Sequence, residues 1–141
     1  MSDKQIGRFE QVDYGDTYTY IDIHNGEIKI CNAIDEHSSI DTNRFLNNNY
    51  FHTDERGKEI FSELNRFLKT QRLHDEFCCG YVPDWNNENI RKYYVYYDHT
   101  DKQYYSGWTV SLELGCSTYF PTKQIADKVC EILNTDSKNG G

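Results

Sequence analysis

The residues best suited to chemistry lie in one short segment, where His74 stands four positions before the adjacent thiols Cys78 and Cys79. Imidazole and thiolate groups bind zinc, but a structural zinc site needs four ligands and has a recognisable spacing, such as two CxxC pairs or HExxH. The chain contains neither pattern. The sequence therefore favours ordinary packing roles for these residues, predicts no metal site, and leaves a metal site as the minor alternative.

Nucleophilic catalysis has equally little support. A catalytic thiolate needs a nearby base or positive charge that lowers its pKa. Cys130 lies beside the apolar stripe of a predicted helix and Cys116 follows Gly115 between predicted strands, and both contexts are typical of packing. Adjacent carboxylates such as Asp75-Glu76 are usually solvated in an acidic chain, and no P-loop or GxGxxG motif occurs. We expect no catalytic residues and no cofactor, with a site at the Cys78-Cys79 segment, enzymatic or nucleotide-binding, as an alternative.

The charge of the chain restricts its partners. Among 141 residues, 15 are Lys or Arg and 23 are Asp or Glu, which gives a net charge of −8. The first 50 residues hold nine of the acids and four of the bases. Such a balance repels nucleic acid and anionic membranes, so we expect neither as a direct partner and expect a basic partner to meet the N-terminal third.

Localisation is predicted from what the sequence lacks. It has no hydrophobic leader and no apolar stretch of about 20 residues that could span a bilayer. The cysteine count is five, an odd number that suits reduced thiols better than a disulfide framework. These features predict a cytoplasmic protein.

An internal repeat organises the chain. The segment TYFPTKQIADKVCEIL, residues 118–133, matches NYFHTDERGKEIFSEL, residues 49–64, in its aromatic pair, its threonine and its helical apolar positions. Thr53 and Thr122 are predicted helix N-caps, since a threonine hydroxyl accepts a hydrogen bond from the first turn. We expect Phe51 and Phe120 to be buried beside them.

Each copy of the repeat follows a predicted strand pair. The first pair is TYTYIDI and EIKICNAI, joined by Asn25-Gly26, the dipeptide best suited to a two-residue type I′ hairpin. The second pair is KYYVYYDH and YYSGWTVSLEL. The polar residues 35–49 are predicted to form a loop. Apolar residues at alternate positions should face the helices: Ile21, Ile23, Ile28, Ile30, Val95, Trp108, Val110 and Leu112.

These elements predict an α+β fold of two related ββ(β)α units with antiparallel strands and one amphipathic helix each. We expect a single domain over 1–141, with the repeat at 14–70 and 91–134. An irregular linker at 73–90 is expected to join the copies, because Gly80, Pro83 and several Asn residues lie there. Residues 135–141 are expected to be a disordered tail.

Tyrosines alternate with the inward apolar residues and should occupy the opposite face of each sheet. Tyrosine is enriched at protein interfaces, so this face is a candidate docking surface. Two alternatives stay open: the rings cover one another across strands, or they form the core of a homodimer. The residues concerned are Tyr18, Tyr20, Tyr94, Tyr96 and Tyr105.

Four segments within residues 14–134 together resemble a family of small accessory proteins encoded by phages and mobile elements of Gram-positive bacteria. They read TYTYIDIHNGEI, NYFHTDERGKEI, VPDWNNENIRKYYVYYD and TYFPTKQIADKV. The helix starts DERGKE and KQIADK depart from the TKEEAE common in that family. The resemblance implies a fold and a genomic setting, in which small inhibitors of host defence, anti-CRISPR proteins among them, are frequent. It carries over no catalytic residue.

The sequence and this resemblance together predict a non-enzymatic inhibitor that binds the basic nucleic-acid groove of a host nuclease such as Cas9. It would act in the host cytoplasm. Besides the tyrosines, the predicted partner-binding residues are Asp35, Glu36, Asp41 and Trp85. The alternative is a single-stranded nucleic-acid or nucleotide binder that stacks bases on the tyrosine face, against which the net charge argues.

Overall fold

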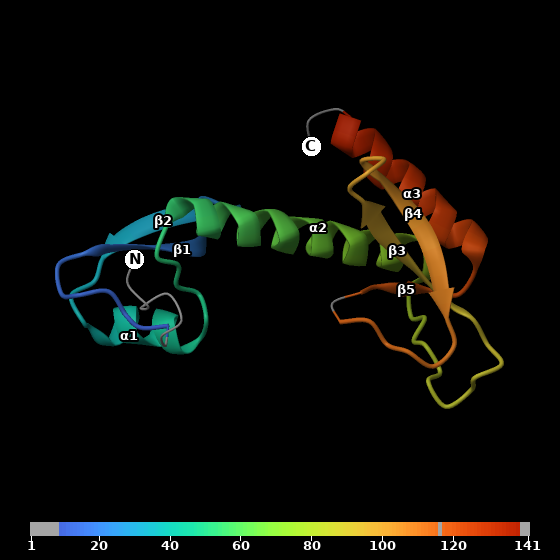
Figure 1. The fold of residues 1–141 in the computed structure, drawn as a ribbon, viewed down its shortest axis with the longest axis horizontal. Coiled ribbons are helices and arrows are strands. Elements are labelled where there is room, and N and C mark those ends of the chain that lie inside the picture. Colours follow the sequence, from blue (N-terminus) through green and yellow to red (C-terminus); the bar gives the residue numbers. More distant parts are fainter. Residues whose placement is uncertain (1–8, 116, 139–141) are drawn as a thin grey trace. The chain divides into compact units, whose positions relative to one another are not determined.

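The computed structural model describes residues 9–115 and 117–138 and has an α+β fold with two antiparallel sheets and three helices (Figure 1). The chain divides into two compact units, Met1–Leu64 and Asn65–Gly141. The elements follow in the order β1 (Thr17–His24), β2 (Glu27–Ile34), α1 (Ser39–Leu46), α2 (Asp54–Cys78), β3 (Lys92–Asp98), β4 (Gln103–Thr109), β5 (Tyr119–Phe120) and α3 (Lys123–Lys138).

The first unit is built on the β1–β2 hairpin. Its turn residues Asn25 and Gly26 have φ values of 53° and 80°, as a type I′ turn requires, which confirms the predicted hairpin. Phe51 lies along the other edge of β1 and exchanges two backbone hydrogen bonds with Thr19, of 2.8 and 2.7 Å. The hairpin therefore has one edge that the chain itself closes.

The predicted loop at 35–49 is wrong over eight residues, because α1 forms there. Ser38 is its N-cap and accepts a hydrogen bond from the Asp41 N–H, while the Asp41 carboxylate accepts one from the Ser38 N–H. This reciprocal pair is a capping box. The pattern Ser-x-x-Asp signals such a start, and the polar composition of the segment obscured it.

Helix α2 begins after Thr53, whose hydroxyl accepts from the Arg56 N–H at 3.1 Å. Gly57 lies in its first turn, where an added Cβ would stand 2.7 Å from Cγ2 of Thr19. Because Gly57 has no Cβ, the first turn of α2 can lie close to β1. The helix continues to Cys78, so residues 73–78, predicted as irregular, are helical and the boundary between the units falls inside α2.

The second unit is a three-stranded sheet in the order β4-β3-β5 with α3 packed against it (Figure 1). Its core is apolar, and helix and sheet share it. The buried residues of this core are Leu73, Phe120, Ala126, Val129 and Leu133. Leu73 belongs to the last part of α2, which explains why that helix extends beyond the predicted boundary.

Both predicted caps are confirmed, because Thr122 accepts from the Ile125 N–H at 3.2 Å as Thr53 does from Arg56. Phe120 is fully buried, as expected, whereas Phe51 is only half-buried. Helix α3 includes residues 135–138, which were predicted to be a tail, and the rest of that tail lies outside the described residues. Within the described part of the chain, none of the helices has the length and apolarity to cross a membrane.

The cap of α3 can be tested with Thr122→Ala. Losing the hydroxyl leaves a first-turn N–H without its partner and should lower the free energy of unfolding by about 1 kcal/mol. Both tryptophans of the chain, Trp85 and Trp108, lie in the second unit, so their fluorescence during urea denaturation reports on this unit. Thr122→Ser keeps the hydroxyl and is the matched control. Equal destabilisation by both variants would contradict the capping role.

Candidate functional site

The candidate site is the face of the β4-β3-β5 sheet that α3 does not cover. Tyr93 and Val95 of β3 pack against the core shared with α3. Tyr94 and Tyr96 alternate with them and therefore lie on the opposite face. The predicted alternation of β3 is correct.

Five aromatic rings form a continuous row on this face, which we call the aromatic ladder. Its order follows the strand register, in which Tyr94 pairs with Tyr119 and Tyr96 pairs with Tyr105. Neighbouring ring centroids are 5.0, 6.2, 6.2 and 6.1 Å apart, within the range of favourable aromatic pairs. The members in sequence along the ladder are Trp85, Tyr119, Tyr94, Tyr96 and Tyr105.

The two exposed rings of the ladder lie together at one end. Tyr119 is buried, Trp85 and Tyr94 are half-buried, and 46% of Tyr96 and 36% of Tyr105 is exposed to solvent. Gly107 lies opposite Tyr94, and a Cβ there would stand 2.9 Å from the tyrosine ring. The glycine thus lets Tyr94 lie against the sheet, which leaves Tyr96 and Tyr105 as the accessible rings.

The covered end of the ladder is held by buried polar contacts. Lys92 is fully buried, and its Nζ donates to the carbonyls of Asn87 and Val110 at 2.6 and 2.7 Å. The same Nζ lies 5.4 Å from the centre of the Trp85 ring. One cation therefore fixes two loops beside Trp85, at the covered end of the ladder.

The open end of the ladder is held by an acidic side chain. The Tyr105 hydroxyl donates to Oδ2 of Asp101 at 2.8 Å. This hydrogen bond, with a smaller contribution from burial, raises the pKa of Tyr105, so the phenol stays protonated at neutral pH. The ring is thereby oriented while its face stays accessible.

In the first unit the predicted outward face is wrong for Tyr18, of which only 1% is exposed. Its ring stacks on Tyr50 with centroids 4.3 Å apart, and its hydroxyl donates to Asp41 at 2.6 Å. Arg44 donates to the same hydroxyl at 2.8 Å and lies 3.7 Å above the half-buried ring of Tyr20. The cause is α1, which was not predicted and covers this face.

The isoleucines expected to face inward here are correspondingly less buried. Ile21 and Ile30 are half-buried, while Ile23 and Ile28 are exposed. Trp108 of the second unit, which was expected inside, is also half exposed, with the Arg91 guanidinium 4.1 Å above its ring.

Two of the predicted partner-binding acids are buried and serve the fold. Asp35 accepts hydrogen bonds from the Tyr50 hydroxyl and the His37 N–H, both at 2.7 Å. Asp41 accepts from Tyr18 and Ser38 at 2.6 and 2.8 Å. A surface role for Asp35 and Asp41 is therefore wrong, because both carboxylates are already satisfied inside the unit; Glu36 is exposed.

Hydrogen bonding controls the ionisation of these carboxyls. The Tyr18 and Ser38 hydrogen bonds lower the pKa of Asp41 to about 2. Burial would raise the pKa of Asp35, but hydrogen bonds led by that of Tyr50 outweigh it and hold the pKa below its usual value. Burial also raises the pKa of Tyr18 and of Tyr50. Both carboxylates are thus charged and both phenols neutral at neutral pH.

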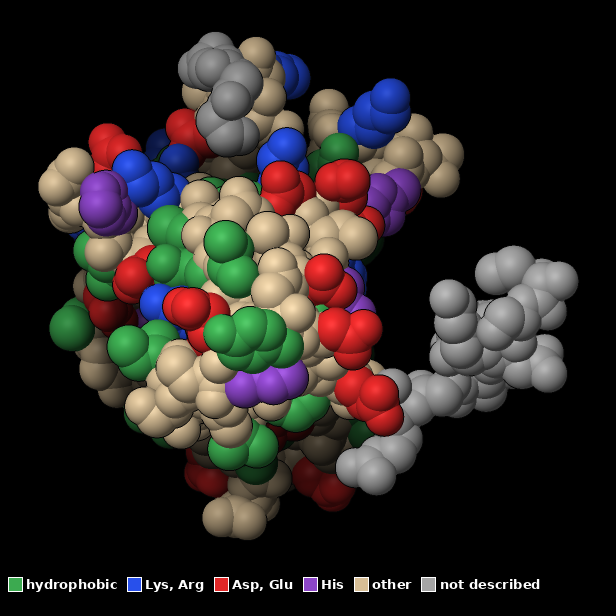
Figure 2. Space-filling model, turned by 90° about the vertical axis from the view of Figure 1, so that its left-hand side faces the viewer, with side chains coloured by type: hydrophobic (Ala, Val, Ile, Leu, Met, Phe, Trp, Pro, Cys, Tyr) green, Lys and Arg blue, Asp and Glu red, His purple; other side chains and the backbone are tan. Residues whose placement is uncertain are grey.

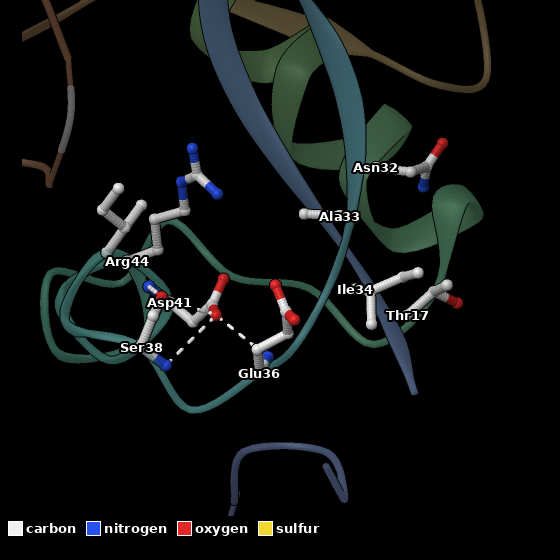
Figure 3. A pocket seen from close by; sticks show the side chains of 9 residues that line it. Thr17, Asn32, Ala33, Ile34, Glu36, Ser38, Asp41 and Arg44 are labelled. Atoms are coloured by element: carbon white, nitrogen blue, oxygen red, sulfur yellow. Dashed lines mark hydrogen bonds between the residues drawn. The ribbon is translucent and has the colours of Figure 1, made fainter. Parts of the chain in front are cut away.

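A cavity of about 580 Å³ lies beside this network, between the end of β2 and α1 (Figure 3). Ile34 and Ile40 line it with apolar side chains, while Glu36 contributes a negative charge and Arg44 a positive one. Figure 3 shows the Asp41 carboxylate turned to Ser38 and Glu36, where it accepts their hydrogen bonds. This cavity is widely open to solvent.

The surroundings of the cysteines indicate that their thiols have packing roles. Burial raises the pKa of Cys78, and raises that of Cys130 to about 11, so few thiolates are present at neutral pH. All four cysteines in the described residues are free. Within residues 9–115 and 117–138, no group of three His, Cys, Asp or Glu side chains could hold a metal ion.

Comparison with models of protein families, with curated proteins and with solved structures gave no match to this chain.

The Asp41 network gives a pH prediction. A carboxyl with a folded pKa of about 2, below its usual 3.8, stabilises the fold above pH 4, and this contribution is lost as pH falls toward 2. An NMR titration of the Asp41 carboxyl carbon should give a midpoint near 2. Tyr18→Phe removes the largest cause and should raise that midpoint. Asp127, whose pKa is lowered by Lys123 and Ser106, is the internal control. An unchanged Asp41 midpoint in Tyr18→Phe would refute the assignment.

Proposed function

We propose that the chain is a non-enzymatic binding protein that docks on another protein through the exposed end of the aromatic ladder. The observation that carries the proposal is the pair Tyr96 and Tyr105, two accessible rings on a sheet face whose other end is fixed by buried contacts. Preorganised aromatic side chains lose little entropy on binding and are frequent hot spots of interfaces. No chemical step is required of this surface.

The distribution of charge favours a basic partner. The first unit has 13 acidic and 6 basic residues, and the second has 10 and 9. On the face in Figure 2, acidic side chains are interspersed with hydrophobic ones. The negative field of the first unit would accelerate the approach of a basic protein and weaken as salt is added.

We propose further that the partner is a host nuclease with a basic nucleic-acid groove, such as the CRISPR effector Cas9, and that the chain inhibits it in the host cytoplasm. The support is the acidic first unit together with the sequence resemblance to phage accessory proteins. Glu36 stays a candidate contact in this proposal, whereas Asp35 and Asp41 do not.

We also propose that the two units are diverged copies of one ββ(β)α unit. Phe51 pairs with β1 and Phe120 pairs with β3, each just before a helix capped by threonine. Helix α1 accounts for the extra length of the first copy. The divergence would have produced one acidic unit and one aromatic unit.

The proposal is tested with the double variant Tyr96→Ala/Tyr105→Ala in a DNA-cleavage assay with purified Cas9 and guide RNA. Losing about 2 kcal/mol at a hot spot should raise the concentration for half-inhibition about thirtyfold. Tyr14→Ala, at an exposed tyrosine of the first unit, is the matched control and should inhibit like the natural chain. Both should keep the natural unfolding temperature within a few degrees.

Three outcomes would contradict the proposal. Undiminished inhibition by the double variant would place the docking surface elsewhere. Absence of any inhibition by the natural chain would reject this nuclease as the partner. Fluorescence anisotropy with labelled oligo-dT tests the stacking alternative, and tight binding that the double variant abolishes would replace the protein partner with single-stranded DNA.

A further inference from the structure

The β1–β2 hairpin has one closed edge and one open edge. Along β1, the Thr19 N–H donates to the Phe51 carbonyl at 2.8 Å. The Ile21 N–H donates to Oδ1 of Asn49, and the Ile21 carbonyl accepts from Nδ2 of the same side chain, both at 2.7 Å. The backbone groups of Thr19 and Ile21 therefore point away from β2.

The register then fixes where the backbone of β2 points. Directly opposite residues in an antiparallel pair either exchange hydrogen bonds or both turn away. Thr19 stands opposite Asn32 and Ile21 opposite Ile30, so Asn32 and Ile30 turn their N–H and C=O groups outward. Because the direction of the backbone groups alternates along a strand, Ile28 and Ile34 also turn their N–H and C=O groups outward. Within the described residues no strand pairs with this edge, so four residues present an open row of donors and acceptors.

The sequence of β2 offers this edge little protection. Natural edge strands are usually short, bulged, or interrupted by proline and lysine. The strand EIKICNAI has eight residues, an unbroken register with β1, no proline and a single lysine. Ile28 and Ile34 are exposed on the side chain face that accompanies the outward backbone groups. The edge is therefore suited to accept another strand with alternate apolar residues.

We propose that β2 binds an extended segment of a partner protein as a third strand of this sheet, and that the segment alternates basic with apolar residues. Main-chain hydrogen bonds to the outward groups of β2 would supply affinity, and side-chain contacts would supply specificity. The apolar residues of the segment would meet Ile28, Ile30 and Ile34.

The charges near β2 indicate which kind of segment would bind to its open edge. Glu27 and Glu36 are exposed at and just beyond the two ends of the strand, in a unit with 13 acidic and 6 basic residues. A second copy of the chain would bring the same acids to the same edge and be repelled. A basic segment gains attraction from both ends.

The cavity of about 580 Å³ adds a side-chain site at the Ile34 end of the strand (Figure 3). Ile34 and Ile40 line it, together with the acidic side chains of Glu36 and Asp41 and the basic side chain of Arg44. A lysine or arginine can pack its methylene stem on apolar surface and keep its charged group beside a carboxylate. Neither this cavity nor the edge involves the aromatic ladder, so the inference stands independently of the function proposed above.

The probe is an acetylated, amidated nonapeptide of alternating lysine and valine, titrated into the isotope-labelled full chain. NMR amide exchange of Ile28, Ile30 and Asn32 should slow on binding. Methylating two backbone nitrogens of the peptide on its binding edge keeps its charge and should weaken affinity about tenfold or more, because two hydrogen bonds are lost. Replacing its lysines with glutamates should abolish binding.

On the protein, Ile30→Pro removes one outward N–H and no bond to β1, and should also weaken binding about tenfold. Tyr96→Ala should leave peptide binding unchanged, which separates this inference from the ladder. Equal affinity of the methylated peptide would overturn the inference, as would unchanged amide exchange in β2. Dimerisation of the chain through β2 without peptide would assign the edge to a second copy instead. The methylated peptide keeps the test valid if Ile30→Pro fails to fold.

Discussion

The two-residue period of the β-strand is the constraint on which both proposed surfaces depend. In β3 it sends Val95 toward α3 and Tyr94 and Tyr96 toward the uncovered face, where cross-strand neighbours complete the ladder. In the hairpin the same period acts on the backbone: once Phe51 and Asn49 bind alternate residues of β1, alternate residues of β2 must face outward. The uncovered tyrosine face of the second unit and the open edge of β2 both follow from ordinary strand geometry.

The two units satisfy that constraint with different cores. The second unit buries apolar side chains between α3 and the sheet, which leaves its tyrosines outside. The described part of the first unit has a two-stranded sheet and closes its core with α1 through charged groups, so Asp41 must accept hydrogen bonds from Tyr18 and Ser38 to stay buried without a large cost. Some of the carboxylates that make the chain acidic therefore serve folding, and only the exposed acids are available to a basic partner.

Local patterns in the sequence predicted the local features. Asn25-Gly26 predicts its turn, Thr53 and Thr122 predict their caps, and the alternation of β3 predicts the ladder face, because each depends on neighbours a few residues apart. The burial of Tyr18 could not be predicted in this way, since it depends on α1, whose short length and polar composition resemble a loop. The burial of Asp35 depends on Tyr50, fifteen residues away, which a local pattern does not reveal. The open edge of β2 requires the register and the Asn49 contact together.

Hydroxyl-radical footprinting of the tyrosines would show whether the chain binds its partner through the exposed end of the ladder. In the isolated chain, we expect high reactivity at Tyr96 and Tyr105 and low reactivity at the buried Tyr18 and Tyr50. In the complex with a purified partner nuclease, Tyr96 and Tyr105 should become protected while exposed Tyr14 keeps its reactivity. A stable complex in which Tyr96 and Tyr105 react as strongly as in the isolated chain would refute docking through the ladder.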